Sequence, residues 1–217
     1  MCAYRVLIGI PAYNEEDSLR PLLQRIDQLE ASHRVDLQVL FVNDGSSDKT
    51  AAILAEAKAS RPFLTVATHR ENQGLGAAIN TILTYALEHL GDEDILVTMD
   101  GDNTHDPIYV PEIVEMLKLQ GLDFVVASRF VKGGKEVGLK AYRKLLSRGA
   151  SFFFRFFFYI PNVQDYSSGY RAYSMAFLRK AVNHWGRLVT ANGFECMAEI
   201  MANTPLVRSN TRIQRCE

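Results

Sequence analysis

The stretch Ile95–Asp102, with the sequence ILVTMDGD, places an apolar run directly before two carboxylates that one glycine separates. An apolar run bounded by polar residues is typical of a buried strand. Asp100 and Asp102 would then lie at the carboxyl end of that strand, where open α/β sheets bind their ligands, with both side chains on one face. Two adjacent negative charges need a cation or a shared proton, and a divalent cation with oxygen ligands fits them and leaves positions free for phosphate oxygens.

Three other interpretations of this stretch compete. It could be a solvated turn, because Asp and Gly are common turn residues. A calcium loop is excluded, because it needs glycine at its sixth position and glutamate at its twelfth, where this chain has His105 and Pro111. The run Asp100–Thr104 also resembles the nucleophile motif of the haloacid-dehalogenase phosphatases. That family usually carries the motif on an early strand, so the rest of the chain has to decide.

Length and composition limit the class of protein. The 217 residues, 47% of them hydrophobic, are enough for one sizeable core, and a net charge of −1 gives no global field that favours nucleic acid. Cys2, Cys196 and Cys216 form neither a metal motif nor a disulfide framework and suit a reducing compartment. We find no signal-peptide pattern and no apolar stretch that approaches the roughly 18 residues of a membrane span.

Strand and helix patterns alternate between residues 6 and 127, which implies an α/β fold with a mostly parallel sheet and right-handed crossovers. Proline at position 11 is expected to break the first strand, because it cannot donate to a ladder. The predicted strands span 6–10, 37–42, 63–67, the run before Asp100, and 124–127. The predicted helices begin at Glu15, span 51–59, follow Gly76, span 108–119, and recur near 175–183 and 193–202.

The pattern changes beyond residue 129. The segment Lys140–Arg148 is basic at helical spacing, and residues 151–160, SFFFRFFFYI, are strongly aromatic but too few to span a bilayer. A basic helix followed by aromatic side chains is typical of an element that lies on a membrane surface. The alternative is that these aromatic residues pack in the core or in a dimer interface.

Six motifs occur in one order along the chain, and together they resemble the family-2 glycosyltransferases of the GT-A fold. Within that family the chain looks most like the dolichol-phosphate (polyprenyl-phosphate) mannosyltransferase and glucosyltransferase branch, over about Val6–Glu199. The phosphatase interpretation does not account for the five motifs outside the aspartates. The motifs are Pro11–Glu15, Asn43–Asp48, Asn72-x-Gly74-x-Gly76, Asp100-x-Asp102, Ser128–Phe130, and Asp165 with Ser168–Arg171.

The resemblance implies one GT-A domain over residues 1–204, a Rossmann-like, mostly parallel sheet flanked by helices. Its membrane-facing acceptor element would lie at about 138–161, and 205–217 would be a C-terminal tail, shortened relative to the family. Relatives usually continue into a further strand and a basic loop, so an incomplete active site is expected.

The resemblance also assigns roles to individual residues. Asp100 and Asp102, with Gly101 between them, would bind Mg²⁺ or Mn²⁺ and the donor diphosphate, and Arg129 would add a fixed cation. Asp102, Arg129 and Asp165 are thus the expected catalytic residues. Other residues are expected to bind the two substrates: Pro11, Tyr13, Glu15, Val42 and Asp44 the nucleotide, and Arg143 and Ser147 the acceptor phosphate.

The expected activity is inverting transfer of mannose or glucose from a GDP- or UDP-hexose to a polyprenyl or dolichyl phosphate. The protein would lie in the cytoplasm, peripheral to the cytoplasmic face of the membrane, with an oligomer possible and no nucleic-acid partner. Two alternatives stay open: transfer to a sugar hydroxyl, with Asp165 as base, or a nucleotide-sugar-binding module with impaired catalysis.

Three positions depart from the family pattern and bear on these roles. Asn43 replaces the usual first aspartate of the second motif, although a neutral amide can still hydrogen-bond a base. Thr104 replaces a common glutamine and alters one metal contact, and Ile82 replaces a common glycine.

Overall fold

The computed structural model describes residues 4–128, 168–191, 193, 196, 199, 200 and 211–215. Within them, a seven-stranded sheet has the order β3-β2-β1-β4-β6-β5-β7. Its strands are β1 (Arg5–Ala12), β2 (Asp36–Asn43), β3 (Leu64–Thr68), β4 (Ile95–Thr98), β5 (Phe124–Ser128), β6 (Arg171–Ser174) and β7 (Thr211–Arg215). All neighbours pair in parallel except β6, which is antiparallel to both β4 and β5.

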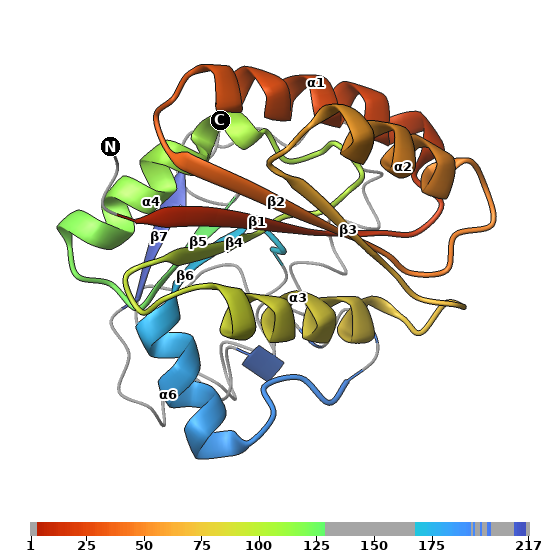
Figure 1. Ribbon diagram of the computed structural model, residues 1–217. Helices are drawn as coiled ribbons and strands as arrows, with labels where there is room; N and C mark the ends of the chain where they lie inside the picture. The colour runs from red at the N-terminus through yellow and green to blue at the C-terminus, as the bar shows by residue number, and fades with distance from the viewer. Residues whose placement is uncertain are drawn as a thin grey trace, which may run out of the picture.

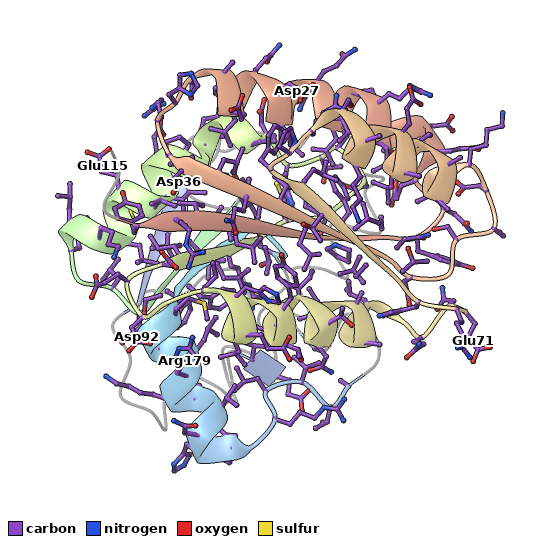
Figure 2. All side chains as sticks on the ribbon, in the orientation of Figure 1. Asp27, Asp36, Glu71, Asp92, Glu115 and Arg179 are labelled. Carbon is purple, nitrogen blue, oxygen red and sulfur yellow. The ribbon has the colours of Figure 1, made fainter. Side chains whose placement is uncertain are left out.

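Helices cover both faces of the sheet (Figure 1). On one face lie α1 (Glu16–Ala31), α2 (Thr50–Ser60) and α4 (Val110–Leu119), and on the other lie α3 (Leu75–His89) and α6 (Met175–Trp185). A single 3₁₀ turn, η1 (Pro107–Tyr109), precedes α4. The predicted α/β fold with a mostly parallel sheet is therefore confirmed. Exposed charged side chains such as Glu115 point away from its layers (Figure 2).

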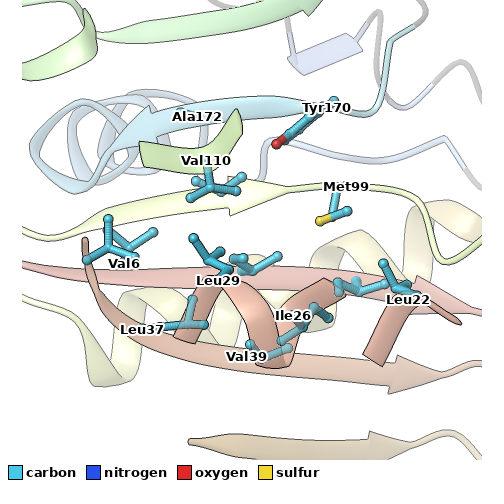
Figure 3. Packing of buried hydrophobic residues seen from close by; sticks show 14 of the residues in the cluster. Val6, Leu22, Ile26, Leu29, Leu37, Val39, Met99, Val110, Tyr170 and Ala172 are labelled. Carbon is cyan, nitrogen blue, oxygen red and sulfur yellow. The ribbon is translucent and has the colours of Figure 1, made fainter. Parts of the chain in front are cut away.

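The core follows from the spacing of apolar residues in α1. Leu22, Ile26 and Leu29 lie on one stripe of the helix and face alternate residues of β1 and β2, among them Val6 and Val39 (Figure 3). Side chains two apart on a strand share a face, so one helical stripe and two strand faces interlock. Each of these fully buried side chains contributes about 1.5–3 kcal/mol.

The predicted break at Pro11 is wrong, because β1 continues to Ala12 and pairs Pro11 with Val42 of β2. The ladder between β1 and β4 ends at Gly9 and Thr98, and the Gly9 carbonyl accepts from the Met99 amide. Pro11, two residues on, faces this same side, where β4 has already ended. Its missing N–H therefore removes no ladder bond.

Two further segments differ from expectation. The predicted helix over 108–119 divides into η1 and α4, with Pro111 in the first turn of α4. Residues 211–215, expected in a tail, form the edge strand β7 beside β5. Their sequence, TRIQR, has one apolar residue, which is too weak a pattern to predict a strand. The predicted helix over 193–202 and the basic and aromatic segments at 140–160 lie mostly or wholly outside the described residues.

The sheet changes winding direction at β1. The chain passes from β1 through α1 to β2 on one side, whereas β4, on the other side of β1, is reached through α3 on the opposite face. This is a topological switch point, where open α/β sheets bind ligands beyond the carboxyl ends of their strands. In the described ranges, no helix is long and apolar enough to cross a membrane.

Candidate functional site

A pocket of about 270 Å³ opens at this switch point. Its walls come from the carboxyl ends of β1, β2 and β4 and from the first turn of α3, four elements that the fold brings together. The lining residues are Pro11, Ala12, Tyr13, Glu15, Asp44, Asn72, Gly74, Leu75, Ala78, Asp100, Gly101 and Asp102. Seven of the residues predicted to bind the nucleotide sugar are thus brought to one pocket.

The loop after β4 presents Asp100 and Asp102 to this pocket. The Asp100 amide donates to His105 Nδ1 at 3.1 Å, and His105 in turn stacks on Tyr170 with ring centroids 5.1 Å apart. Asp102 Oδ1 accepts from both the amide and the hydroxyl of Thr104, at 3.0 and 2.7 Å. Asp102 is exposed, and its Oδ2 makes no hydrogen bond to the part of the chain that the structure describes.

Two glycines allow this loop to pack closely. A Cβ on Gly101 would lie 2.8 Å from the Pro11 carbonyl oxygen, so the loop rests directly on the end of β1. A Cβ on Gly169 would lie 2.4 Å from Asp100 Oδ1. Gly169 is held there because its carbonyl accepts from the Thr98 hydroxyl at 2.8 Å. The segment before β6 therefore forms the back wall of the Asp100 carboxylate.

Asp44, at the end of β2, lines the same pocket, but its carboxylate oxygens accept hydrogen bonds from other parts of the chain. Its carboxylate accepts from the amides of Gln73 and Gly74 at 3.0 and 2.8 Å, and it lies 2.6 Å from His69 Nδ1. The Asp44 side chain is 5% exposed. It therefore anchors the loop before α3 as well as lining the pocket.

The loop that carries Tyr13 and Glu15 is locked to the turn after β2. The Asn14 amide donates to the Ser46 hydroxyl and the Glu15 amide to the Thr50 hydroxyl, at 3.0 and 2.8 Å. Further along, the Glu16 amide donates to Asp48 and the Lys49 amide to Glu16, so each helix N-terminus receives an acceptor from the other segment. Tyr13 is 47% exposed at the end of this fixed loop.

The pocket is strongly negative, since Glu15, Asp44, Asp100 and Asp102 line it and no lysine or arginine of the described residues does. Burial raises the pKa of the Glu15 carboxyl; a hydrogen bond with Ser18 lowers it in part, and the charges of Asp102 and Asp100 raise it again. An anionic diphosphate can enter such a pocket only with a cation that neutralises these charges.

The residues present suit a hard divalent cation. Asp100 and Asp102 offer carboxylate oxygens, the ligands that Mg²⁺ prefers. Among the described residues, no group of three or more His, Cys, Asp and Glu side chains is placed to hold a metal ion. Two protein carboxylates suit Mg²⁺, which commonly keeps its remaining positions for substrate phosphates and water.

Several predicted site residues lie elsewhere. The side chain of Val42 is fully buried in the core beneath α3, so only its backbone could contact a ligand. Asn43 is 1% exposed and its amide oxygen accepts from the Ser46 amide, so this oxygen holds the turn after β2. Arg129, Arg143, Ser147 and Asp165 lie outside the described residues, and their roles stay predictions.

Sequence reasoning missed His69, His105 and the contact of Gly169 with Asp100. Gly74, part of the third motif, lines the pocket and immediately precedes α3 with φ of 90°. The signal that could have identified Gly74 as a pocket residue is a glycine at the start of a helix beside a strand end, where the backbone can approach a ligand closely. No local pattern marks the two histidines.

The sequence model of Glycosyl transferase family 2 matches residues 7–185. A dolichol-phosphate mannosyltransferase of Pyrococcus furiosus is 33% identical over 198 residues, 91% of this chain and 52% of that protein. An undecaprenyl-phosphate mannosyltransferase of Micrococcus luteus is 36% identical over 176 residues, 81% of this chain and 68% of that protein. The chain thus spans about half the length of the first relative and about two thirds of the second.

The fold is also similar to a solved structure of glucosyl-3-phosphoglycerate synthase from Mycobacterium tuberculosis in complex with Mg²⁺ and uridine diphosphate. The TM-score is 0.65 and the sequence identity 23%, and the match covers 98% of this chain and 69% of that one. At this level of identity the similarity concerns the fold alone.

Proposed function

Because this chain belongs to glycosyl transferase family 2, we propose that it transfers a hexose from a nucleotide-sugar donor to a polyprenyl phosphate. The donor is a GDP- or UDP-hexose, with mannose or glucose as the sugar. The observation that carries the proposal is the Asp100–Asp102 carboxylate pair at the switch point of the sheet, beside a pocket that the predicted nucleotide-binding residues line.

In this proposal Asp100 and Asp102 would hold Mg²⁺ or Mn²⁺ together with the donor diphosphate. Such a cation would offset the negative charge of the leaving nucleoside diphosphate. The loop carrying Tyr13 and Glu15 forms a neighbouring wall, fixed in place by its bonds to Ser46 and Thr50. Arg129, which follows β5 in the sequence, adds a second positive charge.

A lipid phosphate suits a site of this kind because its oxygen is already anionic at neutral pH. It can attack the anomeric carbon, with inversion, without a protein base. It needs cations that bring two phosphate-bearing molecules together, and we assign the acceptor phosphate to Arg143 and Ser147. The names of the Pyrococcus and Micrococcus relatives support this acceptor class. A protein that uses it would lie on a membrane surface, and we assign it to the cytoplasmic face.

The test is a transfer assay with radiolabelled GDP-mannose and UDP-glucose, Mn²⁺ or EDTA, and a short polyprenyl phosphate in mixed micelles. The expected product is a lipid-soluble labelled sugar that forms only with metal. The control is the same prenyl chain as a free alcohol, which should accept nothing.

Two results would contradict the lipid-phosphate proposal. Transfer to a sugar hydroxyl that is lost in Asp165→Asn would identify a hydroxyl-using enzyme. Donor binding without transfer to any acceptor would identify a binding module.

A further inference from the structure

A chain of hydrogen bonds leads from the pocket, through a histidine, to the second turn of α3. Asp44 Oδ1 lies 2.6 Å from His69 Nδ1, and His69 Nε2 lies 2.9 Å from the Thr81 hydroxyl. The His69 and Asp44 side chains are 12% and 5% exposed. The three residues come from the end of β2, the end of β3 and the second turn of α3, so this contact joins three elements.

The direction of these bonds follows from the chemistry of the partners. A carboxylate has no proton to give, so Nδ1 of His69 carries the proton and donates to Asp44. Nε2 then either accepts from the Thr81 hydroxyl or donates to it, since that hydroxyl also lies 3.1 Å from the Ala77 carbonyl. In both cases Thr81 fixes the rotation of the ring, and the ring fixes the carboxylate.

The Asp44 carboxylate in turn holds the loop before α3, which forms one wall of the pocket. Its other bonds come from the amides of Gln73 and Gly74, which precede α3. Asn72, Gly74 and Leu75 line the pocket, so the carboxylate sets where this wall lies. The negative charge at the start of α3 also interacts favourably with the helix dipole.

We propose that His69 is a positioning residue of the donor pocket, which holds Asp44 and thereby residues 72–75 in the arrangement that receives the nucleotide. The inference rests on the proposed function only in taking a nucleoside diphosphate as the occupant. His69 touches no substrate and takes no part in bond making. It acts on donor affinity and leaves the acceptor side unchanged.

Two substitutions with amide side chains test the roles of the two ring nitrogens separately. The amide nitrogen of His69→Asn occupies about the position of Nδ1 and keeps a donor for Asp44. The amide nitrogen of His69→Gln reaches the position of Nε2 and leaves Asp44 without that donor. His69→Ala removes both contacts, and Thr81→Val removes only the outer one. His184→Ala, an exposed histidine at the end of α6, is the control.

The first measurement is amide hydrogen exchange in the free protein. The Gln73 and Gly74 amides should exchange about tenfold faster in His69→Ala and His69→Gln, because their acceptor is no longer fixed, and close to wild type in His69→Asn. The second is calorimetric titration of UDP and GDP with Mn²⁺. Affinity for the diphosphate that wild type binds should fall about tenfold in the alanine and glutamine variants and about threefold in Thr81→Val.

In the alanine and glutamine variants we expect a raised KM for the donor and an unchanged KM for the acceptor. His69→Asn should restore the donor KM to near that of wild type. A merely structural histidine would not give this pattern. Unchanged exchange at Gln73 and Gly74 in both His69→Ala and His69→Gln would overturn the inference. So would glutamine and asparagine variants that behave alike. If wild type binds neither UDP nor GDP, the proposed donor class fails, while the exchange rates still decide whether His69 anchors this wall.

Discussion

Asp44 and Asp102 are two aspartates of one pocket, each just beyond the end of a parallel strand, yet the fold uses them in opposite ways. Asp44 is almost fully buried, and backbone amides and a histidine from other elements occupy both of its oxygens. Asp102 is exposed, its bonds come from Thr104 in its own loop, and they involve one oxygen. A position at a strand end is therefore not enough to make a carboxylate a metal ligand. The carboxylate also needs an oxygen whose lone pairs accept no hydrogen bond from the protein.

The difference also separates two regions of the pocket. On the β2 side, carboxylates are committed to backbone amides and hold loops in place, as Asp44 does before α3 and Asp48 does at α1. On the β4 side, Asp100 and Asp102 stand close to Glu15, and no lysine or arginine of the described residues lines the pocket. The first region gives the pocket its shape, and the second gives it its charge.

The largest effect should come from Asp102→Asn. The change keeps the size of the side chain and removes a charge that would bind the metal, so we expect turnover to fall at least about 100-fold, or about 2.7 kcal/mol. Mn²⁺ affinity should fall with it, whereas the free energy of unfolding without metal should stay the same or rise, because charge repulsion is relieved. Calorimetry with Mn²⁺ and urea unfolding measure the two quantities.

Asp92→Asn is the matched control for that experiment. Asp92 pairs with Arg179 at 2.9 Å where α6 passes the end of α3, well away from Glu71 and the loop before α3 (Figure 2). Equal turnover in Asp102→Asn, Asp92→Asn and wild type would show that the exposed carboxylate is not a ligand.

Asp44→Asn should show the reverse pattern. An amide cannot accept from all three donors around it, and its NH₂ group would face a second donor, which costs about 2 kcal/mol. We expect the free energy of unfolding to fall by that amount in urea titrations, with Mn²⁺ affinity changed less than about twofold, because Asp100 and Asp102 are untouched. A large loss of Mn²⁺ affinity with unchanged stability would mean that Asp44 belongs with the ligands.

Much of this arrangement could be predicted from the sequence, and the reason is local. The run ILVT before Asp100 and the leucine stripe of α1 are patterns within a few residues, and they predict a buried strand end and a packed helix without knowledge of the rest. Seven of the predicted nucleotide-sugar residues line one pocket because parallel strands end at the same edge of the sheet.

What could not be predicted depends on contacts between distant residues. Asp44 meets His69 across 25 positions and Gly74 across 30, and no spacing rule marks such pairs. Likewise Pro11 was expected to end β1, but whether a proline removes a ladder bond depends on whether a neighbouring strand is still present, which the sequence does not say. The role of Gly169 needed the position of Asp100, 69 residues away.

Gly169→Ala should have a smaller effect, on Mn²⁺ binding by Asp100. The new Cβ would lie 2.4 Å from Asp100 Oδ1, so the carboxylate must turn away, and we expect Mn²⁺ affinity to fall about tenfold, as for residues that orient metal ligands. Gly91→Ala is the control, because its Cβ would meet only Asp94 Oδ2 at an ordinary 3.7 Å. If both alanine variants bind Mn²⁺ as wild type does, Gly169 does not set the position of Asp100.

The smallest expected effect is on how stability depends on pH, and its sign differs between Asp48 in the first region and Glu15 in the second. Desolvation acts against the ionised form of Asp48, but hydrogen bonds from Thr50 and Glu16 hold its pKa below the ordinary value of 3.8. Its contribution to stability is therefore present above pH 3.8 and is lost as pH falls through the folded-state pKa. Burial, opposed in part by Ser18, and the charges of Asp102 and Asp100 raise the pKa of Glu15 above 4.5. Above pH 4.5 the folded protein keeps a proton on Glu15 that the unfolded chain has lost, so stability falls as pH rises through the folded-state pKa.

Glu15→Gln should remove this decline, because the amide does not ionise. Urea unfolding from pH 4.5 upward should give a flatter profile for the variant, by less than about 1 kcal/mol, since Glu15 is only half-buried and solvent screens its charge. Glu115→Gln on the exposed face of α4 serves as the control and should keep the wild-type slope (Figure 2). Mg²⁺ should flatten the wild-type profile in the same way, because a cation between Asp100 and Asp102 offsets part of the repulsion that Glu15 meets. A Glu15→Gln profile parallel to that of wild type would mean that Glu15 titrates as an ordinary surface carboxyl and that the negative charge of the pocket does not reach it.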